Sequence, residues 1–218
     1  MLSAALRLLV AAAGLLLAFP VVCAAQGDAP VARPEVKVGD RWIYHHWNQL
    51  FRKLEKTYEL RVSFADRNAI YTVVKDQDQR ESEAIWNSDW NSSQSVLGGG
   101  VINPHTGFFR FPLKIGDTYQ TSFEIAFPQR GPHRFRREYT IKVVGWEEVE
   151  VAAGKFRALK LEAEGSWQRL DARGSGQLRS AFWYVPEAKR WVKNILEVHG
   201  PAGPLVSLVE ELVLFNVQ

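Results

Sequence analysis

Cationic side chains gather in one short segment of the sequence, where they could bind an anion. The group contains Arg130, His133, Arg134, Arg136 and Arg137. Guanidinium groups bind carboxylate and phosphate oxygens through paired hydrogen bonds, so the segment predicts contact with a phosphate or a lipid head group. Outward arginines on a strand also act as solvated charges that protect a sheet edge, and this interpretation stays open for Arg134 and Arg136.

Arg137 differs from its basic neighbours because strand alternation places it on the apolar face. Residues two apart share a face of a strand, which groups Arg137 with Phe135 and Tyr139 and leaves Arg134 and Arg136 opposite. A cation that points into an apolar interior needs a carboxylate partner or an anionic ligand. We therefore expect Arg137 to be the strongest single candidate for a functional contact.

Tryptophans form the second group of candidate binding residues. The chain has 8 of them, and Trp86 and Trp90 share one face if their segment is extended. Flat rings beside small polar residues can stack on a sugar or line an apolar cavity, which makes both tryptophans ligand-binding candidates. Large aromatic residues that fill the core of a thin β-protein are the structural alternative.

The sequence contains no motif that identifies a catalytic or metal centre. A Gly-x-Ser-x-Gly elbow, a His-Glu-x-x-His motif and a phosphate-binding Walker loop are all missing from the sequence. His45 and His46 are adjacent and point to opposite faces of a strand, so they cannot chelate one ion. Glu148 and Glu150 share a strand face and could form a glycosidase pair, which needs carboxylates about 5 to 9.5 Å apart. A solvated hairpin explains them equally well, so we expect a non-enzymatic protein without cofactor or metal.

The first 25 residues have the pattern of a secretory signal peptide. Arg7 is followed by an apolar run over residues 8–22, and the small residues Cys23, Ala24 and Ala25 precede a polar stretch. Cleavage after Ala25 leaves 218 − 25 = 193 residues. The alternative is a lipoprotein acylated at Cys23, although Val22 stands where that processing requires a small residue. Only this alternative would place the domain on a membrane.

Cleavage removes the only cysteine, Cys23, together with one cation, Arg7. The mature chain then has no thiol for a disulfide, a nucleophile or a metal, and its formal charge is 26 − 24 = +2. These properties favour a periplasmic or secreted protein. Export, near-neutral charge and the lack of a binding motif argue against a nucleic-acid partner.

The rest of the chain is predicted to form a single β domain over residues 37–218, after a flexible leader over residues 26–36. Hydrophobic residues make up 46% of the chain and charged residues 23%, which is typical of a folded globular protein. Apolar and polar residues alternate in segments that include 54–64, 119–127, 135–143, 159–167 and 191–199. About 9 or 10 antiparallel strands must curl or close, so we expect a strongly curved sheet, a half-barrel or a barrel.

One short pattern occurs twice. Residues 37–42 and 114–119 both read Lys-(Val/Ile)-Gly-Asp-x-aromatic. Glycine followed by aspartate predicts a tight turn, after which the aromatic residue enters a strand facing inward.

Several segments together resemble a family of exported bacterial β-domains of unknown function, described as TapB-like. The segments are Val38-Gly39-Asp40-Arg41-Trp42-Ile43-Tyr44, Phe109 to Asp117, Val151-Ala152-Ala153-Gly154-Lys155-Phe156, Trp183-Tyr184-Val185-Pro186 and Trp191-Val192-Lys193. The resemblance covers about residues 36–217. It implies an exported β-fold and supplies no catalytic residues.

Three functions remain open from the sequence. The first is a periplasmic protein of envelope maintenance that holds an apolar or amphiphilic, lipid-like ligand on a concave, aromatic-rich sheet. The second is a glycan- or protein-binding module that uses exposed tryptophans such as Trp86 and Trp90. The third is a hydrolase that uses Glu148 or Glu150.

Overall fold

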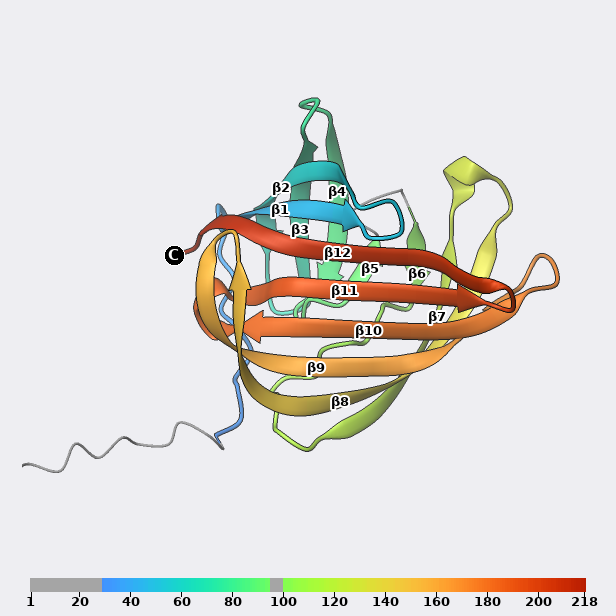
Figure 1. The fold of residues 1–218 in the computed structure, drawn as a ribbon. Helices are drawn as coiled ribbons and strands as arrows, with labels where there is room; N and C mark the ends of the chain where they lie inside the picture. Colours follow the sequence, from blue (N-terminus) through green and yellow to red (C-terminus); the bar gives the residue numbers. More distant parts are fainter. Residues whose placement is uncertain (1–28, 95–99) are drawn as a thin grey trace, which may run out of the picture.

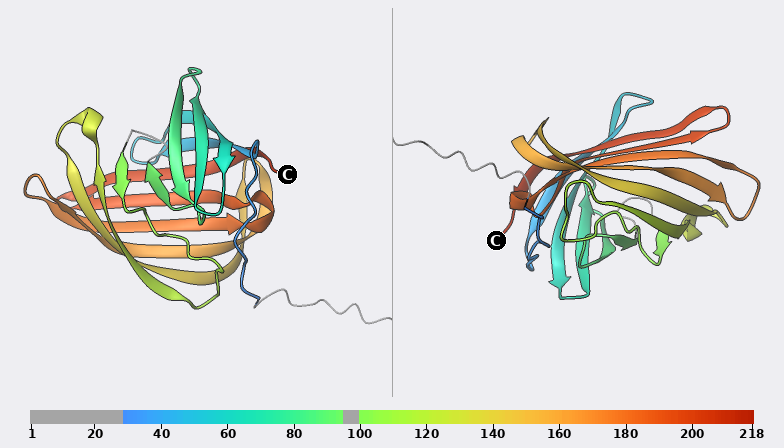
Figure 2. Two further views of the ribbon diagram at one scale, coloured as in Figure 1. Left: turned by 180° about the vertical axis from the view of Figure 1, so that it is seen from behind. Right: turned by 90° about the horizontal axis from the view of Figure 1, so that it is seen from below.

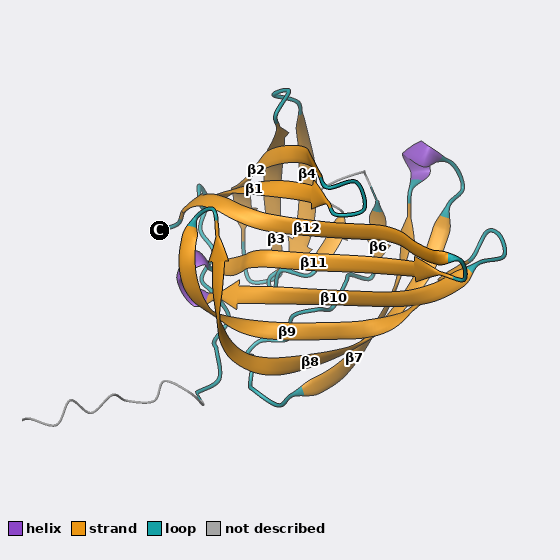
Figure 3. Ribbon diagram, in the orientation of Figure 1, coloured by secondary structure: helices purple, strands orange, loops and turns teal. Residues whose placement is uncertain are grey.

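The computed structural model describes residues 29–94 and 100–218, and strands dominate them (Figures 1 and 3). The predicted signal peptide and the lipoprotein alternative at Cys23 concern residues that lie outside the described ones. In chain order the strands are β1 (Arg41–Asn48), β2 (Lys53–Ala65), β3 (Ala69–Asp76), β4 (Glu81–Asn87), β5 (Ser92–Gln94), β6 (Val101–Asn103), β7 (Thr118–Ala126), β8 (Arg134–Val151), β9 (Gly154–Arg169), β10 (Ser175–Val185), β11 (Arg190–Gly200) and β12 (Gly203–Asn216). Two single-turn 3-10 helices, Pro128–Arg130 and Pro186–Ala188, complete the elements.

The strands form a closed antiparallel barrel of the up-and-down type. Each strand pairs with its neighbours in sequence, and the last strand, β12, pairs with the first, β1. This pairing begins with Arg41 opposite Asn216 and ends with Asn48 opposite Leu208. Every strand has a partner on both sides, although among the described residues β5 and β6 pair with each other only through Gln94 and Val101. The prediction of a mainly β, barrel-like fold is confirmed. The strand number was underestimated because β5 and β6 have only three residues each, too few to show alternation.

Alternation sets the inner face of each strand until a bulge reverses it. In β2, Tyr58, Leu60 and Val62 are buried as expected. Alternation over residues 54–64 predicts the same inner face for Phe64, but Phe64 is 49% exposed. The pairing with β3 shifts register between Val62 and Phe64, and the extra residue, Ser63, turns Phe64 outward.

The part of the chain that the structure describes contains no helix with the length and hydrophobicity of a membrane span.

The two Gly-Asp turns have the same backbone geometry. Gly39 and Gly116 have φ values of +94° and +90°, which glycine adopts without strain. Asp40 N donates to Lys37 O at 3.0 Å, and Asp117 N donates to Lys114 O at 3.1 Å. Each aspartate carbonyl then accepts a bond of 2.9 Å from the neighbouring strand, from Val62 N and Val143 N. The predicted turns are confirmed, and each one begins a strand.

The segment between β6 and β7 packs inside the barrel and closes one end of it. Figure 2 shows this segment passing over the strands that include β10 and β11. The side-chain amide of Asn91 holds the backbone of Phe109 through two hydrogen bonds. Asn91 Nδ2 donates to the carbonyl oxygen of Phe109 at 2.8 Å, and the backbone N–H of Phe109 donates to Asn91 Oδ1 at 2.9 Å. Further along, Leu113 pairs with Val31 through backbone bonds of 2.7 and 2.8 Å, so part of the predicted leader is attached to the barrel.

The two ends of the barrel differ. At one end lie the connections β7–β8, β9–β10 and β11–β12, which we call the hairpin end (Figure 1). At the other lie the β8–β9 and β10–β11 turns and the C-terminus, and buried aromatic rings fill this closed end.

Candidate ligand cavity

The interior of the barrel contains a cavity of about 380 Å³ that is partly open to solvent. Its lining is mostly aromatic and aliphatic, with a few polar side chains. The apolar lining residues are Trp86, Trp90, Ile102, Phe108, Phe109, Phe123, Ile125, Phe127, Phe182, Trp191, Leu196, Val198, Val206 and Leu208. The polar ones are His46, Ser92, Thr106, Arg137, Tyr139, Ser180, Asn194 and Glu210. A cavity of this size and composition is typical of sites for small apolar ligands.

Trp86, Trp90 and Trp191 meet at the closed end of the cavity. The rings of Trp86 and Trp90 are 5.7 Å apart and edge to face, and Trp86 stands 5.9 Å from Trp191 in the same manner. Phe109 stacks on Trp191 at 5.6 Å. Trp86 is 5% exposed and Trp90 2%. The alternative of an exposed stacking platform on these two tryptophans is therefore wrong, because their hydrophobic area is buried inside the barrel.

Arg190 lies behind this aromatic wall and is fully buried. Its guanidinium carbon is 3.8 Å from the ring centre of Trp191 and 4.4 Å from those of Trp86 and Trp90. Trp42 and Tyr44 lie at 5.8 Å. Among the residues described, Arg190 has no carboxylate within ion-pair distance. Burial lowers its pKa, while nearby Tyr44, Tyr58 and Glu210 act in the opposite direction. Ring faces therefore supply most of the close contacts of this charge.

Glu210 on β12 is a charged group of the cavity wall with nearby partners. The hydroxyl of Tyr58 donates to its Oε1 at 3.0 Å, and Nδ1 of His46 lies 3.5 Å from the same oxygen. Burial raises the pKa of the Tyr58 hydroxyl, and the negative charge of Glu210 adds to the effect. Tyr58 therefore stays a protonated donor to Glu210 over the physiological pH range.

Arg137 faces the cavity from β8, as alternation predicts. Its Nε atom is shielded from solvent and has no hydrogen-bond partner among the described residues. Tyr139 and Ser180 line the cavity beside it. Burial raises the pKa of Tyr139, which the charge of Arg137 and the hydroxyl of Ser180 oppose. The structure thus brings one guanidinium and two hydroxyls together on one side of the cavity.

Arg134 and Arg136 point away from this cluster. Both are exposed and bind Glu124 on the outer surface, Arg134 at 2.7 Å and Arg136 at 3.0 Å. These bonds lower the pKa of Glu124. The five ligand-binding candidates are therefore divided: Arg137, Trp86 and Trp90 line one cavity, whereas Arg134 and Arg136 form surface ion pairs.

The cavity walls are incompletely packed toward the hairpin end. Val206 and Leu208 lie on the inner face of β12, yet they are only half-buried, as is Leu196 on β11. Inward aliphatic residues normally become fully buried when a core is filled. Their partial exposure shows that this part of the interior is accessible.

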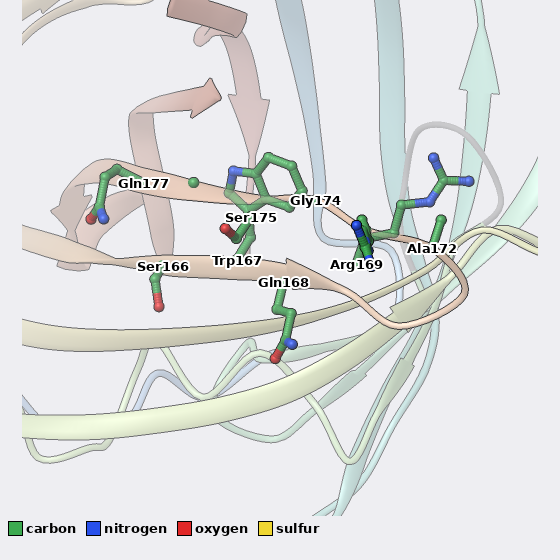
Figure 4. A pocket seen from close by; sticks show the side chains of 10 residues that line it. Ser166, Trp167, Gln168, Arg169, Ala172, Gly174, Ser175 and Gln177 are labelled. Carbon is green, nitrogen blue, oxygen red and sulfur yellow. The ribbon is translucent and has the colours of Figure 1, made fainter. Parts of the chain in front are cut away.

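Two other groups of residues are weaker candidates for a functional site. Glu148 and Glu150 are exposed on β8, and Glu150 lies 3.3 Å from Lys155. Figure 4 shows a hollow on the β9–β10 hairpin, lined by residues that include Trp167, Arg169 and Ala172. Arg169 is held by Asp171 at 2.8 Å. In the described part of the chain, no three His, Cys, Asp or Glu side chains gather as a metal site would require.

Glu210 and Asn194 are cavity residues that sequence reasoning did not identify. Glu210 shares a strand face with Leu208 and Leu212, which is the same signal that identified Arg137. Asn194 gave no such signal. It lies three residues after Trp191, and a register shift opposite Trp183 and Tyr184 lets both side chains reach the cavity.

No family model and no curated protein matches the sequence. Solved structures do match the fold. A candidate lipoprotein from Parabacteroides distasonis aligns with a TM-score of 0.55 at 12% identity, over 86% of this chain and 100% of the other. A candidate exported protein with a YmcC-like fold from Bacteroides fragilis aligns at 0.50 with 15% identity, over 86% and 100%. The hypothetical lipoprotein YmcC from Escherichia coli aligns at 0.50 with 10% identity, over 81% and 84%. At these identities the likeness concerns the fold alone, and the chain has the fold described as YmcC-like.

Proposed function

We propose that this protein is a non-enzymatic binding protein of the bacterial envelope that holds an apolar or amphiphilic, lipid-like ligand inside its barrel. The observation that carries the proposal is the cavity of about 380 Å³ with an aromatic closed end and half-buried aliphatic residues toward the hairpin end. Such a cavity leaves apolar surface in contact with water. The hydrophobic effect therefore favours binding of a ligand that covers this surface.

The sequence and the structural neighbours support a location in the cell envelope or outside the cell. The signal-peptide pattern over residues 1–25 supports export to the periplasm or beyond, with acylation at Cys23 as the alternative. The structural neighbours are a candidate exported protein and lipoproteins, and the resemblance to TapB-like domains points to the same compartment. A role in envelope maintenance fits a lipid carrier or sensor of this kind.

A hydrolase is the less favoured function. Glu148 and Glu150 are exposed and do not line the cavity. Catalytic carboxylates normally lie in a cleft that holds the substrate, and neither of these two lies in the barrel cavity.

The first experiment is the intact mass of the protein purified from periplasm without detergent, under native and denaturing conditions. A native mass above that of the polypeptide by a lipid increment, lost on denaturation, supports the proposal and identifies the ligand class. A chain that begins at Cys23 with acyl groups attached would replace cleavage after Ala25 with membrane anchoring.

A second experiment tests the cavity directly. N-phenylnaphthylamine, a neutral apolar dye, should increase its fluorescence with wild-type protein. The Leu208→Trp variant fills the cavity and should bind at least about tenfold more weakly. Ser207→Trp adds the same side chain at the neighbouring, oppositely facing position of β12 and serves as the control. Equal binding by both variants would contradict binding inside the barrel.

A further inference from the structure

The two charged cavity residues Glu210 and Arg137 differ in whether nearby groups compensate their charge. Glu210 accepts a hydrogen bond from Tyr58 at 3.0 Å, has His46 at 3.5 Å, and lies in the field of the buried Arg190. Arg137 has no ion pair among the described residues, and its Nε has no hydrogen-bond partner. A cavity with one compensated carboxylate and one uncompensated guanidinium attracts an anion.

The donors around Arg137 suit an acidic head group. Arg137 and Tyr139 are two residues apart on the same face of β8, and Ser180 of β10 lies beside the Tyr139 hydroxyl. Because the pKa of Tyr139 is raised, its hydroxyl keeps its proton and remains a donor. One guanidinium and two hydroxyls can together donate hydrogen bonds to the oxygens of a single carboxylate or phosphate.

The position of the cluster gives the ligand a direction. Arg137 lies near the start of β8, toward the hairpin end, and is only half-buried. Trp191 lies at the start of β11, at the closed end. In the barrel, Leu178 of β10 is level with Tyr139, and Tyr184 of β10 is paired with Trp191. These two β10 residues are six positions apart, which is about 20 Å along the strand. A chain that starts at Arg137 therefore has an apolar path that ends on the tryptophans.

We infer that the ligand is a single-chain amphiphile with an anionic head, held by Arg137, Tyr139 and Ser180 while its chain extends toward Trp86, Trp90 and Trp191. This inference rests on the proposed function and adds the charge and orientation of the ligand. A fatty-acid carboxylate and the phosphate of a single-chain phospholipid share the chemistry that the site requires.

The test compares four twelve-carbon probes by isothermal titration: dodecanoate, dodecyl phosphate, dodecanol and dodecyltrimethylammonium, each below its micelle concentration. We expect at least one of the two anions to bind about tenfold or more tightly than dodecanol, and the ammonium probe to bind most weakly. The tighter of the two anions distinguishes a fatty acid from a phospholipid source.

Matched variants assign the effect to the site. Arg137→Met should weaken binding of the preferred anion by about 10- to 100-fold and leave dodecanol binding unchanged. Tyr139→Phe should weaken binding of the same anion by a smaller factor. Arg136→Met removes a neighbouring guanidinium that binds Glu124 outside the barrel and should have no effect. Circular dichroism spectra establish that each variant is folded.

The outcomes separate this inference from the proposed function. If dodecanol binds as tightly as the anions, or if Arg137→Met changes nothing, the anionic head is overturned while a lipid-binding barrel remains. Tightest binding of the ammonium probe also overturns it and points to Glu210. If none of the four probes binds, the proposed function fails, and the inference fails with it.

Discussion

The hydroxyl of Tyr44 donates a hydrogen bond of 2.7 Å to the backbone carbonyl oxygen of Trp191, although their strands, β1 and β11, are not paired. The indole N–H of Trp42 makes a similar bond of 2.7 Å to the carbonyl oxygen of Ala188. Both bonds pass beneath β12, which separates the two strands in the barrel. They connect the first strand to the β10–β11 turn and to the start of β11, and they support the wall of rings that encloses Arg190.

Removal of the Tyr44 bond should destabilise the closed end of the barrel. We expect Tyr44→Phe to lower the free energy of unfolding by about 1 kcal/mol, because a buried carbonyl loses a donor while the ring is kept. Urea denaturation followed by tryptophan fluorescence measures the change. Tyr71→Phe removes a hydroxyl from the outer face of β3 and should cost much less. Equal losses in the two variants would show that the Tyr44 bond adds no stability.

Substitution of Arg190 by lysine tests whether ring faces hold the buried charge. A planar guanidinium stacks on several rings at once, whereas an ammonium is compact and strongly hydrated, so Arg190→Lys should lose about 2 kcal/mol or more at pH 7. The buried lysine has a pKa below its unfolded value of about 10.4. The unfolded chain then binds more protons than the folded chain, so the stability of the variant should rise with pH up to that value.

Arg190→Met is the control for this titration. It keeps much of the side-chain volume but has no proton to lose, so its stability should not show the same rise. Denaturation at pH 7 and at about pH 10 compares the two variants. Parallel pH profiles would mean that the lysine is not confined among the rings.

Gly165 on β9 should tolerate no side chain, because β8 approaches it closely. A Cβ atom at this position would overlap the carbonyl oxygen of Glu138, next to Tyr139 of the ligand cavity. We expect Gly165→Ala to separate the strands locally and cost about 3 kcal/mol. The reverse change on the same face, Ala163→Gly, should cost about 1 kcal/mol or less. Urea unfolding measures both, and a smaller loss for Gly165→Ala would show that the strands can move apart freely.

Acid should weaken the hairpin end of the barrel. Hydrogen bonds from Arg169 and from the backbone N–H of Arg134 hold the pKa of Asp171 well below its ordinary value of 3.8. A carboxylate with a lowered folded pKa stabilises the fold above the unfolded pKa, and this contribution is lost as the pH falls toward the folded pKa. Asp171→Asn should therefore be less stable than wild type at pH 7, and the difference should shrink at about pH 2. A difference that persists unchanged in acid would exclude an ionic origin.

The sequence by itself determined the local structure and the direction of most side chains. Period-two alternation predicted antiparallel strands, and it placed Arg137 on the inner face, where the structure has it. The Gly-Asp pattern predicted two equivalent turns, because the left-handed φ values of Gly39 and Gly116 favour glycine. These features depend on residues close together in the chain, so a single sequence contains them.

Only the tertiary structure decided what each side chain meets. Closure of β12 on β1 places Glu210 beside His46 and Tyr58, residues more than 150 positions away. Register shifts turned Phe64 outward and brought both Trp191 and Asn194 to the cavity, since one extra residue reverses the alternation beyond it. Whether Trp86 and Trp90 face solvent or a cavity also depends on strands that lie far away in sequence. Alternation shows which face a residue occupies, and only the closed barrel shows that this face surrounds a cavity.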